Sequence, residues 1–239
     1  MAETFQRVPR DLRWHGEIHQ QTNKKKMSRV IHEQTRWLDL IEDIDALTKL
    51  TDSMWQETKH QPQYEYTGLV DLDFDQILQI DPDVVPFHTK SIGKIKQSLH
   101  AGMLRNNQIK RYEFENSHKI HNQISEKFDI TKTQVHLNVQ EPGNVVGIHV
   151  DKYRIHMTRG EHDFSKTLTK DLFSGVIFCH DWQLGQVFMT GTESITNWKQ
   201  GDSYTFPWYM PHGSANAGKH DRYLIQFVGE LTQLNKKND

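Results

Sequence analysis

The second half of the chain constrains the fold most, because short apolar runs alternate there with turn residues from Thr131 onward. Each run is rich in β-branched or aromatic residues, which strands favour. Six such runs are present: Thr133–Val139, Val145–Val150, Val176–His180, Gln186–Met189, Ser203–Trp208 and Arg222–Val228. Turn residues separate them, at Pro142-Gly143-Asn144, Gly160, Gly185, Gly191, Gly201-Asp202 and Gly213 to Gly218. This spacing predicts an antiparallel β-sandwich or barrel.

The first 130 residues have a more helical and polar pattern. Apolar side chains recur at steps of three and four between Met27 and Leu50, which predicts an amphipathic helix. A second helix is expected from an N-cap at Ser91 to about Leu104, and a weaker third one over residues 118–128. We therefore predict an α+β protein with a single domain over residues 1–239. Its helical part, about 1–130, would pack on a β-sandwich over about 131–232, followed by a frayed tail.

Composition excludes several classes of protein. No run approaches the roughly 20 apolar residues that a membrane-spanning helix needs, and the N-terminus lacks the apolar region of a secretory signal. The 29 basic and 31 acidic side chains nearly balance, which argues against coating nucleic acid by charge alone. The only cysteine, Cys179, excludes a disulfide framework and fits a reducing compartment. These features predict a soluble, cytoplasmic protein.

The chain contains 15 histidines, and histidine is the commonest metal ligand. His149 and Asp151 lie two residues apart at the end of a predicted strand, so their side chains point to the same side. The best third ligand is His212, which follows the strand that ends at Trp208. Two histidines and one carboxylate on one face of an ion form the facial triad of non-haem Fe(II) oxygenases. Other histidines lie near these positions or near carboxylates and are weaker candidates: His156, His162-Asp163, His180-Asp181 and His220.

The run from His136 to Asp151, with its Pro-Gly turn between two strands and its terminal His-x-Asp, resembles the core of the Fe(II)/2-oxoglutarate-dependent oxygenases. The distal part is similar too, because Arg222 follows His212 by ten residues (222 − 212). The resemblance covers about residues 133–230, and small hydroxylases of the aspartyl/asparaginyl or prolyl type are the most similar. It implies a double-stranded β-helix, which is a jelly-roll or cupin-like β-sandwich.

The resemblance also implies roles for these residues. His149, Asp151 and His212 would bind Fe(II), and Arg222 would hold the far carboxylate of the co-substrate 2-oxoglutarate. With O₂, and with ascorbate as a stimulating reductant, such a dioxygenase would hydroxylate an unactivated C–H bond of an amino acid or amino-acid residue. Related halogenases have a small residue in place of the carboxylate, so Asp151 favours hydroxylation.

Other polar residues are weaker candidates for contact with the co-substrate. Asn138 and Gln140 match positions where demethylases of the AlkB type place an asparagine and a tyrosine, although both could simply face solvent. His180 lies in phase with Val176 and Phe178, so it would either touch the co-substrate or be a hydrogen-bonded core histidine. Asn216, between His212 and Arg222, would orient its loop or the histidine.

The substrate is the least constrained property. Residues 156–170 are polar and could cover the iron site as a lid, and Lys152, Arg154 and Arg159 would make its mouth basic. A basic mouth favours an acidic or zwitterionic substrate, either a small molecule or a peptide. Oxidation of a nucleotide or nucleic acid base is an alternative, but the second spaced arginine of the AlkB type and a basic stripe with aromatics are missing. A non-enzymatic cupin-like metal-binding module is another, and it would have no need of Arg222.

Overall fold

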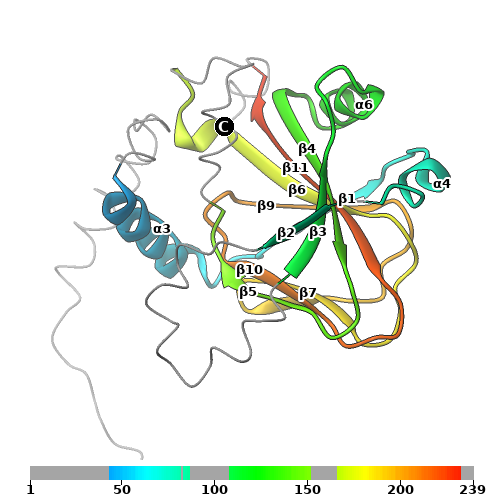
Figure 1. Cartoon of the computed structure of the whole chain (residues 1–239). Coiled ribbons are helices and arrows are strands. Elements are labelled where there is room, and N and C mark those ends of the chain that lie inside the picture. Colours follow the sequence, from blue (N-terminus) through cyan, green and yellow to red (C-terminus); the bar gives the residue numbers. More distant parts are fainter. Residues whose placement is uncertain (1–42, 82, 87–107, 152–165, 233–239) are drawn as a thin grey trace, which may run out of the picture.

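Two antiparallel β-sheets face each other in the part of the chain that the structure, a computed structural model, describes: residues 43–81, 83–86, 108–151 and 166–232. The larger sheet has its strands in the order β1-β9-β6-β11-β4-β3-β2, and the smaller one in the order β5-β10-β7-β8. Figure 1 shows the two sheets and labels most of their strands. The larger sheet consists of β1 (Glu65–Leu69), β2 (Asp83–Pro86), β3 (Gln108–Glu113), β4 (Ile130–Gln140), β6 (Leu172–Phe178), β9 (Asp202–Phe206) and β11 (Arg222–Leu231). The smaller sheet consists of β5 (Val145–His149), β7 (Gln186–Thr190), β8 (Glu193–Ile195) and β10 (His212–Asn216). The predicted α+β fold with a cupin-like jelly roll is confirmed.

Strand alternation separates two apolar layers. On β11, Ile225 and Phe227 face outward into a cluster that includes helix α6 (Lys119–Phe128). Leu224 faces inward, between the two sheets. The inner layer is rich in aromatic residues, with Phe178 and Trp198 stacked at 3.8 Å between ring centroids. The inner face is therefore dry and rigid over part of its length, and polar side chains on it need partners.

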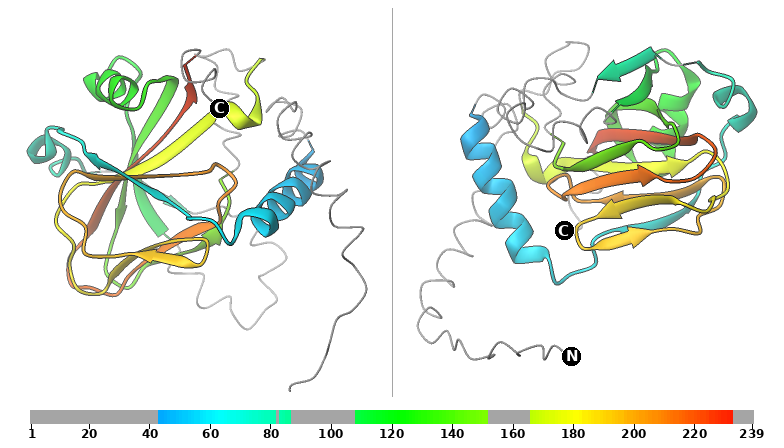
Figure 2. Two further views of the ribbon diagram at one scale, coloured as in Figure 1. Left: turned by 180° about the vertical axis from the view of Figure 1, so that it is seen from behind. Right: turned by 60° about the horizontal axis from the view of Figure 1, so that its bottom comes forward.

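Helices cover the large sheet and one end of the sandwich. Helix α6 confirms the predicted helix over 118–128; the ring of His118 caps it by accepting a hydrogen bond from the Ile120 amide. It lies on the outer side of β4, away from the small sheet (Figure 1). Helix α3 (Ile44–Thr58) stands beside one end of both sheets (Figure 2) and packs its apolar face against Trp208. The other helices within the described residues are short: α4 (Phe74–Ile77) and the 3₁₀ turn η2 (Thr169–Asp171).

The described part of the first 130 residues contains three strands that were not expected. β1, β2 and β3 all belong to the large sheet. Their short sequences carry little alternation, and pairing holds them: β1 pairs with β9, β3 with β4, and β2 with β3. The described part of the helix expected over 27–50 follows its N-cap Asp43 and extends beyond the expected end, to Thr58, because apolar spacing persists to Met54.

Several other expectations lie wholly or partly outside the described residues. These are the helix over 91–104, the start of the 27–50 helix and most of the lid over 156–170. The basic side chains at 152, 154 and 159 also lie there. Among the helices that are described, none has the length and apolar character needed to cross a membrane.

Candidate metal centre

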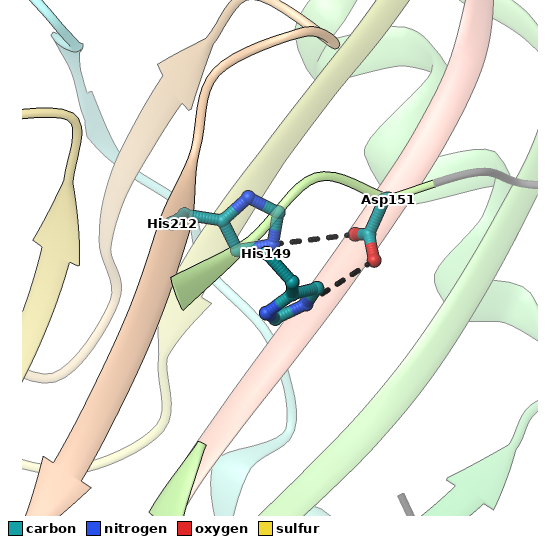
Figure 3. Close-up of side chains that lie close together, drawn as sticks. All are labelled: His149, Asp151 and His212. Carbon is teal, nitrogen blue, oxygen red and sulfur yellow. Dashed lines mark ion pairs between the residues drawn. The ribbon is translucent and has the colours of Figure 1, made fainter. Parts of the chain in front are cut away.

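The three predicted metal ligands come together at one end of the small sheet. β5 ends at His149 and β10 begins at His212, and the two histidines are directly paired across the antiparallel ladder. Paired residues project on the same face, and Asp151 follows two positions after His149. One ligand atom from each residue lies within 4.8 Å of the other two. Figure 3 shows the carboxylate of Asp151 facing both imidazole rings.

A tight turn brings β5 into this position. Asn144 donates its amide hydrogen to the Glu141 carbonyl at 3.2 Å, with Pro142 and Gly143 at the two central positions. Gly143 has φ +83°, which a type II turn requires at its third residue and which glycine adopts without strain. The Pro-Gly motif of the sequence thus reverses the chain between β4 and β5 and crosses from the large sheet to the small one.

Hydrogen bonds orient both imidazole rings. Nδ1 of His149 lies 2.8 Å from the Gly147 carbonyl, and Nδ1 of His212 lies 3.0 Å from the Met210 carbonyl. A carbonyl oxygen only accepts, so each Nδ1 carries the proton. Nε2 of each ring then faces Asp151, at 3.4 Å for His149 and 3.3 Å for His212. This is the arrangement that metal-binding histidines adopt.

The Asp151 carboxylate has a third polar neighbour. Gln226 on β11 donates Nε2–H to Oδ2 of Asp151, and its own oxygen accepts a hydrogen bond from Asn138 at 3.0 Å. Burial alone would raise the pKa of Asp151, but the facing imidazoles of His212 and His149 hold it well below its usual range. The carboxylate is therefore an anion, fixed in orientation by an amide. Two imidazole nitrogens and an oriented carboxylate fit a divalent first-row transition metal.

A cavity extends from the triad between the two sheets. Two of the predicted metal ligands, His149 and His212, line it. Arg222, Asn138 and Gln140 line it as well. Phe188 and Leu224 supply apolar wall. The cavity opens to solvent, and the space in it for the centres of water-sized molecules is about 40 Å³. Of the four residues predicted to contact the co-substrate, Arg222, Asn138 and Gln140 line this cavity, whereas His180 does not.

Arg222 is the most unusual of these side chains. It is only 3 % exposed, and Nη1 donates to the Val187 carbonyl at 3.0 Å. Nε has no hydrogen-bond partner, and among the described residues no carboxylate forms an ion pair with the guanidinium. Burial lowers the pKa of Arg222 to about 9. A buried cation without a counter-ion is costly, because its charge is neither hydrated nor paired.

The two amides on β4 are held by the protein. The Gln140 side chain donates to the Asn144 carbonyl at 2.9 Å and accepts from Ser214 at 3.2 Å, which ties β4 to β10. Asn138 bridges Gln226 and Arg111. Neither amide faces solvent, since both are buried.

Two predicted candidates lie elsewhere. β6 ends at Phe178, two residues before the end of the predicted strand. His180 therefore lies beyond β6, and it does not line the cavity. Its Nδ1–H donates to the Asp181 carbonyl at 2.7 Å, and its Nε2 accepts from the Tyr223 amide at 3.2 Å. Burial lowers the pKa of this neutral ring. Asn216 donates to the Gln140 and His220 carbonyls and so orients its loop rather than His212.

The sequence analysis missed Gln226 and Arg111, which both line the cavity. Alternation from Arg222 predicts that Gln226, four residues further along the same strand, shares its face. No comparable signal marks Arg111, because β3 was not expected.

No model of a known protein family matches the chain, and no curated protein matches it. Among solved structures, it is similar to a viral collagen prolyl hydroxylase from Paramecium bursaria Chlorella virus-1 in complex with 2-oxoglutarate. The identity is 16 %, the match covers 72 % of this chain and 98 % of that one, and the TM-score is 0.43. A predicted oxalate decarboxylase from Thermotoga maritima has 16 % identity over 52 % of this chain and 82 % of that one, with a TM-score of 0.33. The nickel complex of the non-haem monooxygenase ThoJ has 11 % identity over 46 % of this chain and 49 % of that one, with a TM-score of 0.32. At such TM-scores these likenesses carry no argument about activity.

Proposed function

We propose that this protein is an Fe(II)- and 2-oxoglutarate-dependent dioxygenase that hydroxylates an unactivated C–H bond of an amino acid or amino-acid residue. The observation that carries the proposal is the pairing, in one cavity, of the His149–Asp151–His212 cluster with the buried, uncompensated cation of Arg222. A protein that only held a metal ion would have no use for such a cation. A dicarboxylate that chelates the metal at one end satisfies both features.

His149, Asp151 and His212 would hold the metal, leaving its remaining positions open to the cavity. When bound, Fe(II) supplies the activation of O₂ that is coupled to oxidative decarboxylation of 2-oxoglutarate to succinate and CO₂. Gln226 keeps the Asp151 carboxylate in orientation, and the two backbone carbonyls hold each Nδ1 so that each Nε2 faces the site.

Arg222 would bind the distal carboxylate of 2-oxoglutarate through its guanidinium. Arg222 lines the cavity and forms no ion pair with a carboxylate among the described residues, so the acid would add a charge-assisted hydrogen bond. Phe188 and Leu224 bound the space between arginine and metal with apolar surface, which excludes water and strengthens that interaction.

The test is anaerobic titration of the purified protein with Fe(II) and 2-oxoglutarate, followed by visible spectroscopy. The wild type should develop the weak visible band of a metal–2-oxoglutarate complex and, on admission of air, release succinate slowly. Asp151→Ala should lose both signals. Asp181→Ala is the matched control: it removes an exposed aspartate that also follows a histidine, and it should retain both. Absence of both the band and succinate in the wild type would overturn the proposal.

A further inference from the structure

A second arginine, Arg111, lines the cavity from β3, which lies two strands away from β11 in the large sheet. Arg111 on β3 is paired in register with Asn138 on β4, and Asn138 is paired with Leu224 on β11. Directly paired residues share a face, so Arg111 projects inward with them. It lines the same cavity as His149 and His212.

The hydrogen bonds of Arg111 leave one side of its guanidinium open. Nε donates to Oδ1 of Asn138 at 3.0 Å, and Asn138 is held in turn by Gln226. Among the described residues, neither Nη of Arg111 has a hydrogen-bond partner and no carboxylate forms an ion pair with it. Burial lowers the pKa of Arg111, while the Asp151 and Glu113 carboxylates act in the opposite direction. The guanidinium is thus held through Nε, and its Nη donors make no hydrogen bond to the described residues.

The charges of the site do not balance without a further anion. A divalent metal and the two arginines carry four positive charges, whereas Asp151 and 2-oxoglutarate together carry three negative ones. Arg222 and the metal take the two ends of the co-substrate, so the excess positive charge falls on Arg111. Charges in a low-dielectric site are stable only when they are paired.

We infer that Arg111 forms a subsite for a single carboxylate of the primary substrate, in the cavity that the candidate metal ligands and Arg222 also line. This inference rests on the proposed function. A carboxylate matches the two parallel N–H donors that the fork of an arginine presents, and one negative charge matches the excess. A phosphate monoester, with a charge near −2, would overcompensate it.

The test uses the full-length protein loaded with Mn(II) and saturating 2-oxoglutarate, with trifluoroacetate as the carboxylate probe. Bound Mn(II) is paramagnetic, so it shortens the ¹⁹F relaxation time of any trifluoroacetate that occupies a site close to the metal. Arg111→Met keeps the apolar stem and removes the charge. Lys110→Gln is the matched control, because it removes a cation from the next residue of β3, whose side chain faces outward and pairs with Glu141.

We expect the Mn(II)-dependent relaxation in the wild type and in Lys110→Gln, and a fall to a tenth or less in Arg111→Met. Isothermal titration should show 2-oxoglutarate affinities within twofold in all three proteins, which also establishes that Arg111→Met is folded.

Equal relaxation in Arg111→Met and the wild type would overturn the inference and leave the proposed function standing. A loss of 2-oxoglutarate binding in Arg111→Met alone would assign Arg111 to the co-substrate and overturn it as well. Displacement of the probe by inorganic phosphate at lower concentration than by acetate would overturn the choice of a carboxylate. Failure of the wild type to bind 2-oxoglutarate would overturn the proposed function first.

Discussion

Replacing Arg222 with methionine tests most directly whether this buried cation exists for a ligand. Burial lowers its pKa from the ordinary value to about 9, and at about 1.4 kcal/mol for each tenfold change this corresponds to a cost of about 5 kcal/mol for the buried charge. Methionine removes that cost but gives up the hydrogen bond to the Val187 carbonyl, which is worth about 1.5–3 kcal/mol. We expect the ligand-free variant to be more stable than the wild type by about 1–4 kcal/mol.

The pH dependence supplies an internal check. Between about pH 9 and 12.5 the unfolded chain binds the Arg222 proton and the folded protein releases it, so the contribution of this group to stability rises with pH. The advantage of Arg222→Met is therefore fully present below about pH 9 and shrinks above it. Raising the pH from 9 to 10.5 should reduce that advantage by about 2 kcal/mol.

Ligand binding should move in the opposite direction to stability. The variant loses a charge-assisted contact to the distal carboxylate of 2-oxoglutarate, which is worth about 2–5 kcal/mol in a desolvated site. The affinity for 2-oxoglutarate in the presence of Mn(II) should therefore fall at least about 30-fold.

Urea denaturation followed by tryptophan fluorescence, with and without Mn(II) and 2-oxoglutarate, measures both effects. Lys199→Met is the control: it removes an exposed cation paired with Asp181 and should change stability by less than about 1 kcal/mol. A ligand-free Arg222→Met protein that is less stable than the wild type, with unchanged 2-oxoglutarate affinity, would refute the reasoning. Arg222 would then be a structural residue.

Three further predictions concern the support of the site and the core. Gln226→Leu removes the amide that orients Asp151, and should weaken Mn(II) binding about 10–100-fold by isothermal titration; an unchanged affinity would show that the amide is not needed. Burial raises the pKa of the Cys179 thiol to about 12, so Ellman's reagent at pH 8 should react with it only at the rate at which the protein opens, and fast labelling of the native protein would contradict this. Gly175→Ala places a methyl group 2.6 Å from a backbone oxygen of β9 and should cost about 1–3 kcal/mol in thermal denaturation, whereas Gly147→Ala, with nothing within 4 Å, should be close to neutral.

Six of the eight strands that the structure describes in the second half were predictable because each carries its own signal. β8 and β10 were missed, and β10 lies where the residues from Gly213 to Gly218 predicted a turn. β11 and β4 alternate inner and outer residues, and the Pro142-Gly143 turn has the residues that its backbone requires. Their ends were less predictable: β6 stops at Phe178, which moves His180 out of the cavity. Strand ends depend on the partner strand, which local sequence does not specify.

The first 130 residues show the opposite case. β3 has the sequence Gln-Ile-Lys-Arg-Tyr-Glu, with two adjacent cations and little apolar character. It becomes a strand because it pairs with β4, more than twenty residues further along the chain. The entropy lost in closing this connection is offset by pairing between residues far apart in the sequence. No local pattern therefore predicts the strand. Arg111 could not have been assigned to the site without that pairing.

The sequence by itself predicted the candidate ligand set and its local geometry: His149 and Asp151 project to one side because strand residues alternate, and His212 and Arg222 follow at a spacing that resembles that of the oxygenases. Only the tertiary structure decided which side chains share a cavity. It paired His149 with His212, buried Arg222 without a carboxylate, and brought Arg111 and Gln226 in from separate strands. The physical reason is that side-chain direction follows from local backbone geometry, whereas burial and charge balance depend on which strands become neighbours.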